Sequence, residues 1–342
     1  MIAGEIAVVE RLQRLSSQGE TRANERLREL QPLLGDDLRA VERNLLDVPG
    51  ARDVHRGARH LLACGGKRLR PVCVLLAARL GRGVTPEAIE LAIAAELVHN
   101  ATLLHDDVVD DASSRRGVTA ARLVYGNAIS IFAGDWLLVD ALRRVRRAAP
   151  PDVLERLLEV IDEMIVAESL QLERRGRLAT SFDDWLAVAT GKTAALFRWA
   201  MYAGARVGGL DRAQAALLER FGCELGLAYQ AVDDVLDVAG DAGITGKALF
   251  TDLREGKGSL PVVLAVRSDP GIAASLVLEA DASADRLAAA AARLASVGAV
   301  DEARAYAVAR TAAAIDTLTP FAAGEARDTL AGIAYELSAR LA

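Results

Sequence analysis

The amino-acid sequence predicts an all-α fold. Apolar residues recur every three or four positions through most of the chain, as at Ile89, Ile93, Leu97 and Ala101, which is the spacing of one helix face. The sustained alternation of apolar and polar residues that is typical of β-hairpins is missing. Hydrophobic residues make up 52% of the 342 residues and charged residues 26%, so the chain is long enough for one large helical core or about two smaller domains.

The predicted elements follow in chain order. Residues 1–25 are polar and are expected to fray, whereas residues 26–342 show no change of composition and are expected to form a single all-helical domain. Helical spacing predicts three apolar helices, one that begins at about Pro86 and precedes residues 103–111, one around residues 154–165 and one around residues 227–238. The Ala-rich region from about residue 271 predicts further packed helices.

The bulk composition argues against several classes of protein. The formal net charge is −6 and no basic tail with interleaved aromatic residues is present, so nucleic-acid binding is not expected. No apolar stretch approaches the roughly 20 residues of a membrane span, and residues 1–10 do not resemble a signal peptide. Cys64, Cys73 and Cys223 lack the spacing of metal ligands. A cytoplasmic protein without a disulfide framework is therefore expected.

Two aspartate clusters on apolar helices point to a metal site. In the first, Asp106 and Asp110 stand four residues apart, which on a helix places their Cβ atoms about 6 Å apart on one face. Asp233 and Asp237 repeat this spacing in the second cluster. Like charges at this distance repel, and divalent cations would neutralise them. The alternative, a solvated helix end, explains one cluster better than two.

Basic residues follow both clusters. Arg115 and Arg116 come after the first, and Lys247, Arg254 and Lys257 come after the second. Carboxylates that hold metal, beside cations that do not, indicate a ligand with several negative oxygens. A diphosphate with Mg²⁺ meets this description, because Mg²⁺ binds a few carboxylates together with phosphates and waters.

Lysine is rare in this chain and always follows glycine. Of the 41 Lys and Arg residues only four are lysines, namely Lys67, Lys192, Lys247 and Lys257. Gly-Lys is a common dipeptide at helix ends, which is one explanation. We favour the other, in which a compact charge is placed beside backbone that can approach a ligand closely.

A third group of cations lies before the first acidic cluster. The glycine-rich turn of residues 65–71, GGKRLRP, carries Lys67, Arg68 and Arg70 and suits a diphosphate that needs no metal. It is not a P-loop, because the Gly-x-x-x-x-Gly-Lys-Ser/Thr spacing is absent. His99 lies about two helical turns before Asp106 and can face the same cavity, although a buried core histidine is the alternative.

The order of these motifs resembles that of the trans-isoprenyl diphosphate synthases, also called polyprenyl synthetases. The resemblance covers roughly residues 45–264. Its motifs are GGKRLRP (65–71), HNATLLHDDVVDD (99–111), RRG (115–117), GNAISIFAGDWLL (126–138), GKTAALF (191–197), YQAVDDVLD (229–237) and DLREGKGSLP (252–261). It implies an isoprenoid synthase-type helical bundle around a deep central cavity, with the two Asp motifs facing each other across its mouth, and a homodimer.

The resemblance also implies roles for individual residues. Mg²⁺, as three ions with bound diphosphate, is expected on Asp106, Asp107, Asp110, Asp233 and Asp237. Contacts to the allylic diphosphate are expected from Arg115, Lys192, Thr193, Gln230, Lys247 and Lys257. Contacts to isopentenyl diphosphate are expected from Lys67, Arg70, His99 and Arg116. The residues expected to act in catalysis are Asp106, Asp107, Asp110, Lys192, Asp233 and Lys247.

The activity that the resemblance implies is a head-to-tail (1'-4) condensation of isopentenyl diphosphate with an allylic diphosphate to an all-trans polyprenyl diphosphate. Mg²⁺ and cations would stabilise the charge on the departing diphosphate, and an apolar cavity would keep water from the allylic cation. The expected partners are these two substrates and a second copy of the chain. No membrane span is expected, although the product would be membrane-seeking.

Small residues before the first acidic cluster predict a long product. Ala101 and Thr102 stand where short-chain family members often carry aromatic residues, so they leave space for a growing chain. We expect a product in the heptaprenyl to decaprenyl range, and a farnesyl or geranylgeranyl diphosphate synthase is the first alternative. A non-catalytic subunit of a heteromeric synthase, a class I terpene cyclase and a purely structural protein are weaker ones, since both Asp motifs and the additional cations are present.

Overall fold

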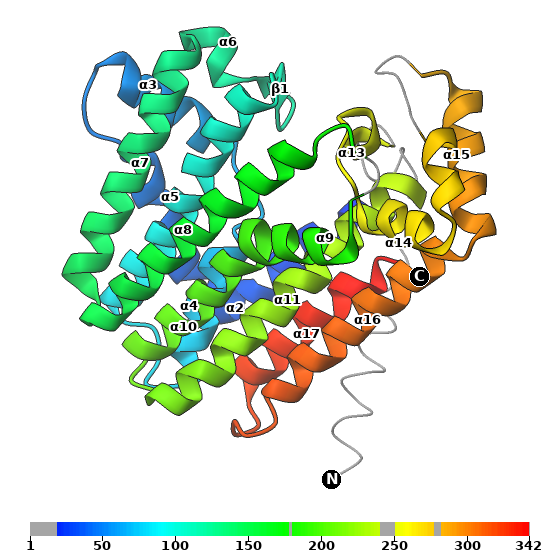
Figure 1. Cartoon of the computed structure of the whole chain (residues 1–342). Helices are drawn as coiled ribbons and strands as arrows, with labels where there is room; N and C mark the ends of the chain where they lie inside the picture. The colour runs from blue at the N-terminus through cyan, green and yellow to red at the C-terminus, as the bar shows by residue number, and fades with distance from the viewer. Residues whose placement is uncertain (1–18, 178–179, 240–249, 277–281, 342) are drawn as a thin grey trace. The chain divides into compact units, whose positions relative to one another are not determined.

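Helices make up nearly all of the regular structure. The computed structural model describes residues 19–177, 180–239, 250–276 and 282–341 (Figure 1). In this described part the strands are β1 (Ser114–Arg115) and β2 (Val118–Thr119), a short antiparallel pair in which Ser114 lies opposite Thr119. The predicted all-α fold is confirmed.

The chain forms two compact units, which we describe separately. The N-terminal unit holds residues 29–158 and 199–219. The C-terminal unit holds residues 159–198 and, within the described part of the chain, residues 19–28 and those from 220 onward. The expectation of a single domain over residues 26–342 stays a prediction. Residues 1–18 of the expected N-terminal extension lie outside the described residues.

The N-terminal unit consists of helices whose apolar side chains are buried. In chain order these are most of α2 (Gly19–Leu46), α3 (Asp53–Leu62), α4 (Leu69–Arg79), α5 (Pro86–Val109), α6 (Ala121–Tyr125), α7 (Asn127–Ala148), the start of α8 (Pro151–Arg174), the end of α10 (Ala195–Val207) and the start of α11 (Arg212–Ala239). The predicted helices at Pro86 and around residues 154–165 and 227–238 are found in α5, α8 and α11.

Helix α5 carries the first acidic cluster, is capped at its N-terminus and packs against α7. It begins at Pro86, after Thr85, whose hydroxyl accepts a hydrogen bond from the Ala88 amide (3.3 Å). Helix α7 packs alongside it (Figure 1). The helices approach closely because α7 has a glycine at Gly134, where a Cβ would lie 3.0 Å from the Ala101 carbonyl oxygen. This packing fixes the end of α5.

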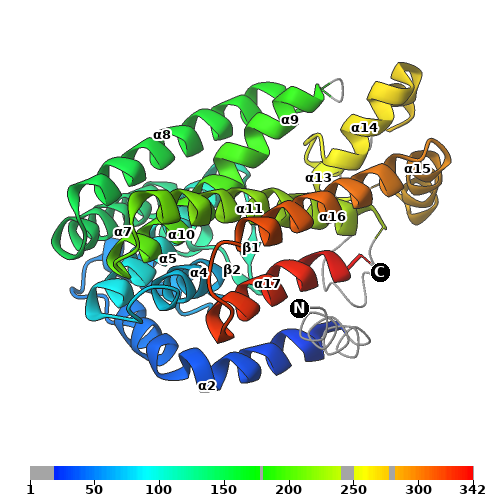
Figure 2. The ribbon, with the colours of Figure 1, turned by 90° about the horizontal axis from the view of Figure 1, so that it is seen from below.

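The C-terminal unit contains the rest of α8, α10 and α11 and the later elements. These are α9 (Phe182–Val188), the π-helical turn η1 (Ala189–Ala194), α13 (Thr251–Arg254), α14 (Leu260–Ser268), the 3-10 turn η2 (Pro270–Ser275), α15 (Ala284–Ser296), α16 (Ala299–Thr317) and α17 (Glu325–Ala339). Helices α16 and α17 lie side by side in both views (Figures 1 and 2). The described part of the Ala-rich region is therefore helical, as predicted.

The described helices and the three cysteines can be compared with the predictions about membrane spans and disulfides. Among the described helices, none combines the length and the apolar character needed to cross a bilayer. Cys64, Cys73 and Cys223 are free thiols.

Candidate active site

The carboxylates of the first acidic cluster differ in how deeply they are buried. Asp106 lies in the last turn of α5, Asp110 is the C-cap residue that follows it, and both are half-buried. Asp107 is fully buried and accepts hydrogen bonds from Arg115, through Nε (2.8 Å) and through Nη2. Its second oxygen, Oδ2, is buried and has no hydrogen-bond partner among the described residues. Asp107 therefore holds an arginine, whereas Asp106 and Asp110 are partly exposed to solvent.

The β1–β2 turn brings Arg115 back to this cluster. Arg116 adopts a left-handed conformation (φ 51°) and Gly117 follows with φ 76°, which reverses the chain directly after Arg115. Arg122 fixes the preceding loop, since its Nε donates to the Ala112 carbonyl (2.9 Å) and its Nη2 lies 3.1 Å from Asp111. The Arg-Arg-Gly motif thus positions Arg115 against α5.

The glycine-rich turn is anchored by a buried arginine. Arg68 is left-handed (φ 50°) and 6% exposed, and it precedes α4. Its guanidinium donates to Glu42 (2.5 and 3.1 Å) and to Glu96 (2.6 Å). With Arg68 held inside the unit, Lys67 is left exposed. No separate role for Arg68 could be predicted from the sequence, because three cations within four residues do not show which one is buried.

The residues predicted to bind isopentenyl diphosphate come together in the N-terminal unit. A Cβ at Gly66 would lie 2.9 Å from Nη1 of Arg116, so this arginine reaches the glycine-rich turn. Burial, then the charges of Arg70 and Arg116 and of two further arginines, lower the pKa of His99 well below its usual value. A neutral imidazole therefore sits among cations, an arrangement that would bind an anion strongly.

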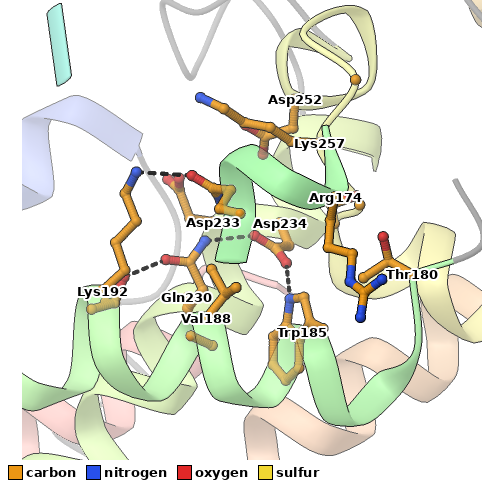
Figure 3. Close-up of a pocket in the computed structure, with 16 residues that line it drawn as sticks. Arg174, Thr180, Trp185, Val188, Lys192, Gln230, Asp233, Asp234, Asp252 and Lys257 are labelled. Atoms are coloured by element: carbon orange, nitrogen blue, oxygen red, sulfur yellow. Dashed lines mark hydrogen bonds between the residues drawn. The ribbon is translucent and has the colours of Figure 1, made fainter. Parts of the chain in front are cut away.

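The second acidic cluster lies at a pocket within the C-terminal unit (Figure 3). The pocket is lined by predicted residues and by others that the sequence did not indicate. The predicted ones are Lys192, Thr193, Gln230, Asp233 and Lys257, and the others include Gln171, Arg174, Trp185, Asp234 and Asp252. Lys247 lies outside the described residues.

A π-helical turn presents Lys192 to this pocket. Lys192 pairs with Glu168 and donates to Oε1 of Gln171 (2.9 Å), both on α8. The preceding Gly191 packs tightly against α8, because a Cβ there would lie 2.7 Å from the Glu163 carbonyl oxygen. Glycine is thus needed for packing as well as for close approach to a ligand.

The other described lysines follow glycines that are needed for different reasons. Gly66 has φ 155° and faces Arg116, and Gly256 has φ 74° and would place a Cβ 2.8 Å from the Gly176 amide nitrogen. Lys257 pairs with Glu255 (2.8 Å). The Gly-Lys pattern therefore has three separate local explanations.

In the second acidic cluster, Asp233 is half-buried and lines the pocket. Asp237 accepts hydrogen bonds from the amides of Thr251 (2.9 Å) and Asp252 (3.3 Å) at the start of α13. Asp234 is buried and accepts from three donors. Burial, followed by the charge of Asp252, raises the pKa of Asp234 to about 8 and that of Asp237 to about 7. Metal binding by Asp237 stays a prediction.

The predicted chain-length positions lie one turn and more before Asp106. Ala101 is 1% exposed, and Thr102 is half-buried and donates its hydroxyl to the His99 carbonyl (2.8 Å). Both side chains are small, and the role predicted for them stays a prediction.

The fold and these clusters define an all-helical protein with two acidic motifs on helices, each accompanied by cations suited to phosphate groups. The chain matches the polyprenyl synthetase family over residues 52–294. It therefore belongs to the polyprenyl synthetase family, and it is a trans-prenyltransferase.

Individual relatives agree with this assignment. An octaprenyl diphosphate synthase from Haemophilus influenzae is 35% identical over 257 residues, 74% of this chain and 77% of that protein. A geranylgeranyl diphosphate synthase from Mycobacterium tuberculosis is 39% identical over 207 residues, 59% of each. A crystal structure of a polyprenyl synthase from Caulobacter crescentus, complexed with calcium and isoprenyl diphosphate, has a TM-score of 0.85 and 34% identity, covering 95% of this chain and 99% of that one.

Proposed function

We propose that this prenyltransferase joins isopentenyl diphosphate head-to-tail (1'-4) to an allylic diphosphate and repeats the step to make a long-chain, all-trans polyprenyl diphosphate. The observation that carries the proposal is the group formed in the N-terminal unit by three cations, Lys67, Arg70 and Arg116, and the neutral His99, in addition to the acidic motifs. An enzyme that only ionises and cyclises one prenyl diphosphate has no use for a second diphosphate site.

The acidic residues fit Mg²⁺, which takes oxygen ligands and keeps substrate phosphates and waters in its shell. We assign it first to Asp106, Asp110 and Asp233, whose side chains are half-buried rather than enclosed. Asp237 and the unpartnered Oδ2 of Asp107 are further proposed ligands, and three ions is the count we expect. When bound, Mg²⁺ stabilises the negative charge that develops on the departing diphosphate.

Residues of the C-terminal pocket would hold the allylic diphosphate. Lys192 and Lys257 supply positive charge there, and Thr193 and Gln230 supply hydrogen bonds. These groups act at the leaving group, where charge develops as the allylic C–O bond breaks. Arg115 and Lys247 are proposed for the same diphosphate.

The cationic group of the N-terminal unit would orient isopentenyl diphosphate. Lys67, Arg70 and Arg116 can bind its phosphate oxygens, and neutral His99 can donate its single N–H to another. Fixing the double bond beside the allylic carbon removes much of the entropic barrier to forming the new C–C bond. The proton lost afterwards would pass to the released diphosphate.

Small residues at Ala101 and Thr102 and the octaprenyl-forming relative support a long product. The geranylgeranyl-forming relative supports a shorter one as the second candidate. Incubation of the purified enzyme with farnesyl and isopentenyl diphosphates, followed by dephosphorylation and chromatography, decides between them. Products of seven or more isoprene units are expected, and products that stop at geranylgeranyl would establish the second candidate.

We also propose that two copies of the chain associate. Helix α7 exposes Ile131, Phe132 and Val139, of which Phe132 is 58% exposed, and such apolar side chains are typical of an interface. The cytoplasmic location expected from the sequence stays a prediction.

A further inference from the structure

A buried tryptophan outside the recognised motifs contacts the second acidic cluster. Trp185 of α9 is 4% exposed, and its indole Nε1 donates to Oδ2 of Asp234 on α11 at 2.8 Å (Figure 3). Its ring packs against Phe182, with centroids 5.7 Å apart, and against Tyr306 of α16, at 5.5 Å and nearly perpendicular. The indole is therefore held by its ring contacts and aims its one donor at the carboxylate.

Asp234 is in turn the centre of a hydrogen-bond chain. Its Oδ1 accepts from Nε2 of Gln230 (2.7 Å), and Oε1 of Gln230 accepts from the hydroxyl of Thr193 (2.6 Å). The Leu260 amide donates to Oδ2 at 2.7 Å. Through these bonds one carboxylate connects α9, η1, α11 and the start of α14.

Both ends of this hydrogen-bond network lie on segments that carry residues assigned to the allylic diphosphate. Thr193 directly follows Lys192, and Leu260 comes three residues after Lys257. Asp233, the proposed metal ligand, directly precedes Asp234 and lines the pocket. Asp234 is thus hydrogen-bonded, directly or through Gln230, to the segments that carry both lysines, and it adjoins Asp233 on α11.

We propose that Trp185 is a positioning residue for the allylic diphosphate site: its indole N–H holds Asp234, which aligns Asp233, Lys192 and Lys257. The inference rests on the proposed function. In this role Trp185 acts through Asp234 rather than by binding the diphosphate or the metal itself. Loss of its N–H should weaken binding of the allylic diphosphate and leave binding of isopentenyl diphosphate unchanged.

The test compares Trp185→Phe with Trp199→Phe. Trp199 is a suitable control because it is also buried (0% exposed) and its Nε1 also makes one hydrogen bond, to the Val153 carbonyl (3.0 Å), and neither of these residues lines the pocket. For Trp185→Phe we expect KM for the allylic diphosphate and the Mg²⁺ concentration for half-maximal rate to rise about tenfold, as is typical for the loss of one buried hydrogen bond. Trp199→Phe should change neither value, although both variants lower the melting temperature.

Equal KM values and equal Mg²⁺ dependence in Trp185→Phe and the wild type would overturn the inference. If Trp185→Phe does not fold, β-(3-benzothienyl)alanine at position 185 keeps the shape of the ring and removes the N–H, and the same readouts apply. Titration calorimetry with inorganic diphosphate and Mg²⁺ separates this inference from the proposed function. A wild type that forms no prenyl product refutes the function, whereas equal diphosphate affinity in wild type and variant refutes the role of Trp185.

Discussion

Asp107 differs from its neighbours in the first acidic cluster in being fully buried. It is 0% exposed and paired with Arg115, whereas Asp106 and Asp110 are half-buried. Three aspartates of one motif therefore differ in burial and in their contacts. Asp106 and Asp110 are partly exposed to solvent, and Asp107 holds the arginine of the following turn.

Single substitutions should separate these roles. Asp106→Ala removes a half-buried carboxylate and should lower kcat at least about a hundredfold, as is typical when charge stabilisation at a reacting centre is lost, with little change in stability. Asp107→Ala leaves Arg115 without its partner and should also lower the free energy of unfolding by about 2 kcal/mol. Steady-state kinetics and urea denaturation measure both effects. Equal stability of the two variants would contradict the assignment.

His99 should make stability depend on pH in a defined direction. Its pKa in the folded protein lies well below the ordinary 6.5, because burial and the neighbouring arginines disfavour the imidazolium. Below pH 6.5 the unfolded chain binds a proton that the folded chain does not, so the contribution to stability is complete above pH 6.5 and is lost as the pH falls. His99→Asn should reduce the loss of unfolding free energy between about pH 7.5 and 5.5. An unchanged loss would show that His99 is not the group responsible.

The kinds of residues at the site could be predicted from the sequence, but their partners could not. Spacing placed Asp106 and Asp110 on one helix face, and in the structure Asp106 lies in the last turn of α5 and Asp110 is its C-cap. Nothing in the spacing shows that Asp234 binds Trp185, because the two residues are 49 positions apart and meet only through packing. Asp252 could not be predicted for a similar reason. It lines the pocket because the turn that carries it is bound by Asp237, which accepts a hydrogen bond from the Asp252 amide.

At the scale of elements, the π-helical turn η1 depends on one glycine. Gly191 leaves no room for a side chain, because a Cβ would lie 2.6 Å from the Ala167 Cβ and 2.7 Å from the Glu163 carbonyl oxygen. The turn carries Lys192 toward its partners on α8. Any displacement of η1 from α8 therefore moves a residue that we assign to the allylic diphosphate.

Gly191→Ala should lower the free energy of unfolding by about 1–3 kcal/mol through overpacking and raise KM for the allylic diphosphate. Gly324→Ala is the control, since Gly324 has an extended backbone and a Cβ there would meet no atom of the described residues within 4 Å. It should leave KM unchanged. Thermal denaturation and kinetics on both variants make the comparison, and a normal KM in Gly191→Ala would argue against a strict position for η1.

Long helices were predictable because tertiary packing and local periodicity agree in them. Helix α5 is buried on nearly every side, yet Thr85 and Pro86 mark its start unambiguously. The β1–β2 pair and η1 were not predicted, since a two-residue strand has no periodicity and a π-turn differs from an α-helix by one inserted residue. Both irregular elements carry candidate site residues, Arg115 and Lys192.

At the scale of the whole molecule, product length should respond to Ala101. Ala101→Phe adds a ring at a position that is 1% exposed, next to the close approach of α5 and α7 at Gly134. We expect the main product to become shorter by several isoprene units. Chromatography of the dephosphorylated products measures this, with the melting temperature as a check on folding. A folded variant with the wild-type product distribution would show that chain length is limited elsewhere.

The placement of the lysines has a consequence for chemical labelling. All four lysine side-chain amines of this chain belong to motifs assigned to diphosphate binding, and Lys67 is exposed. Amine-reactive reagents, which label most proteins diffusely, would here act as reagents directed at the site. Bound diphosphate should protect these amines from acetylation, and immobilising the protein through its lysines should inactivate it.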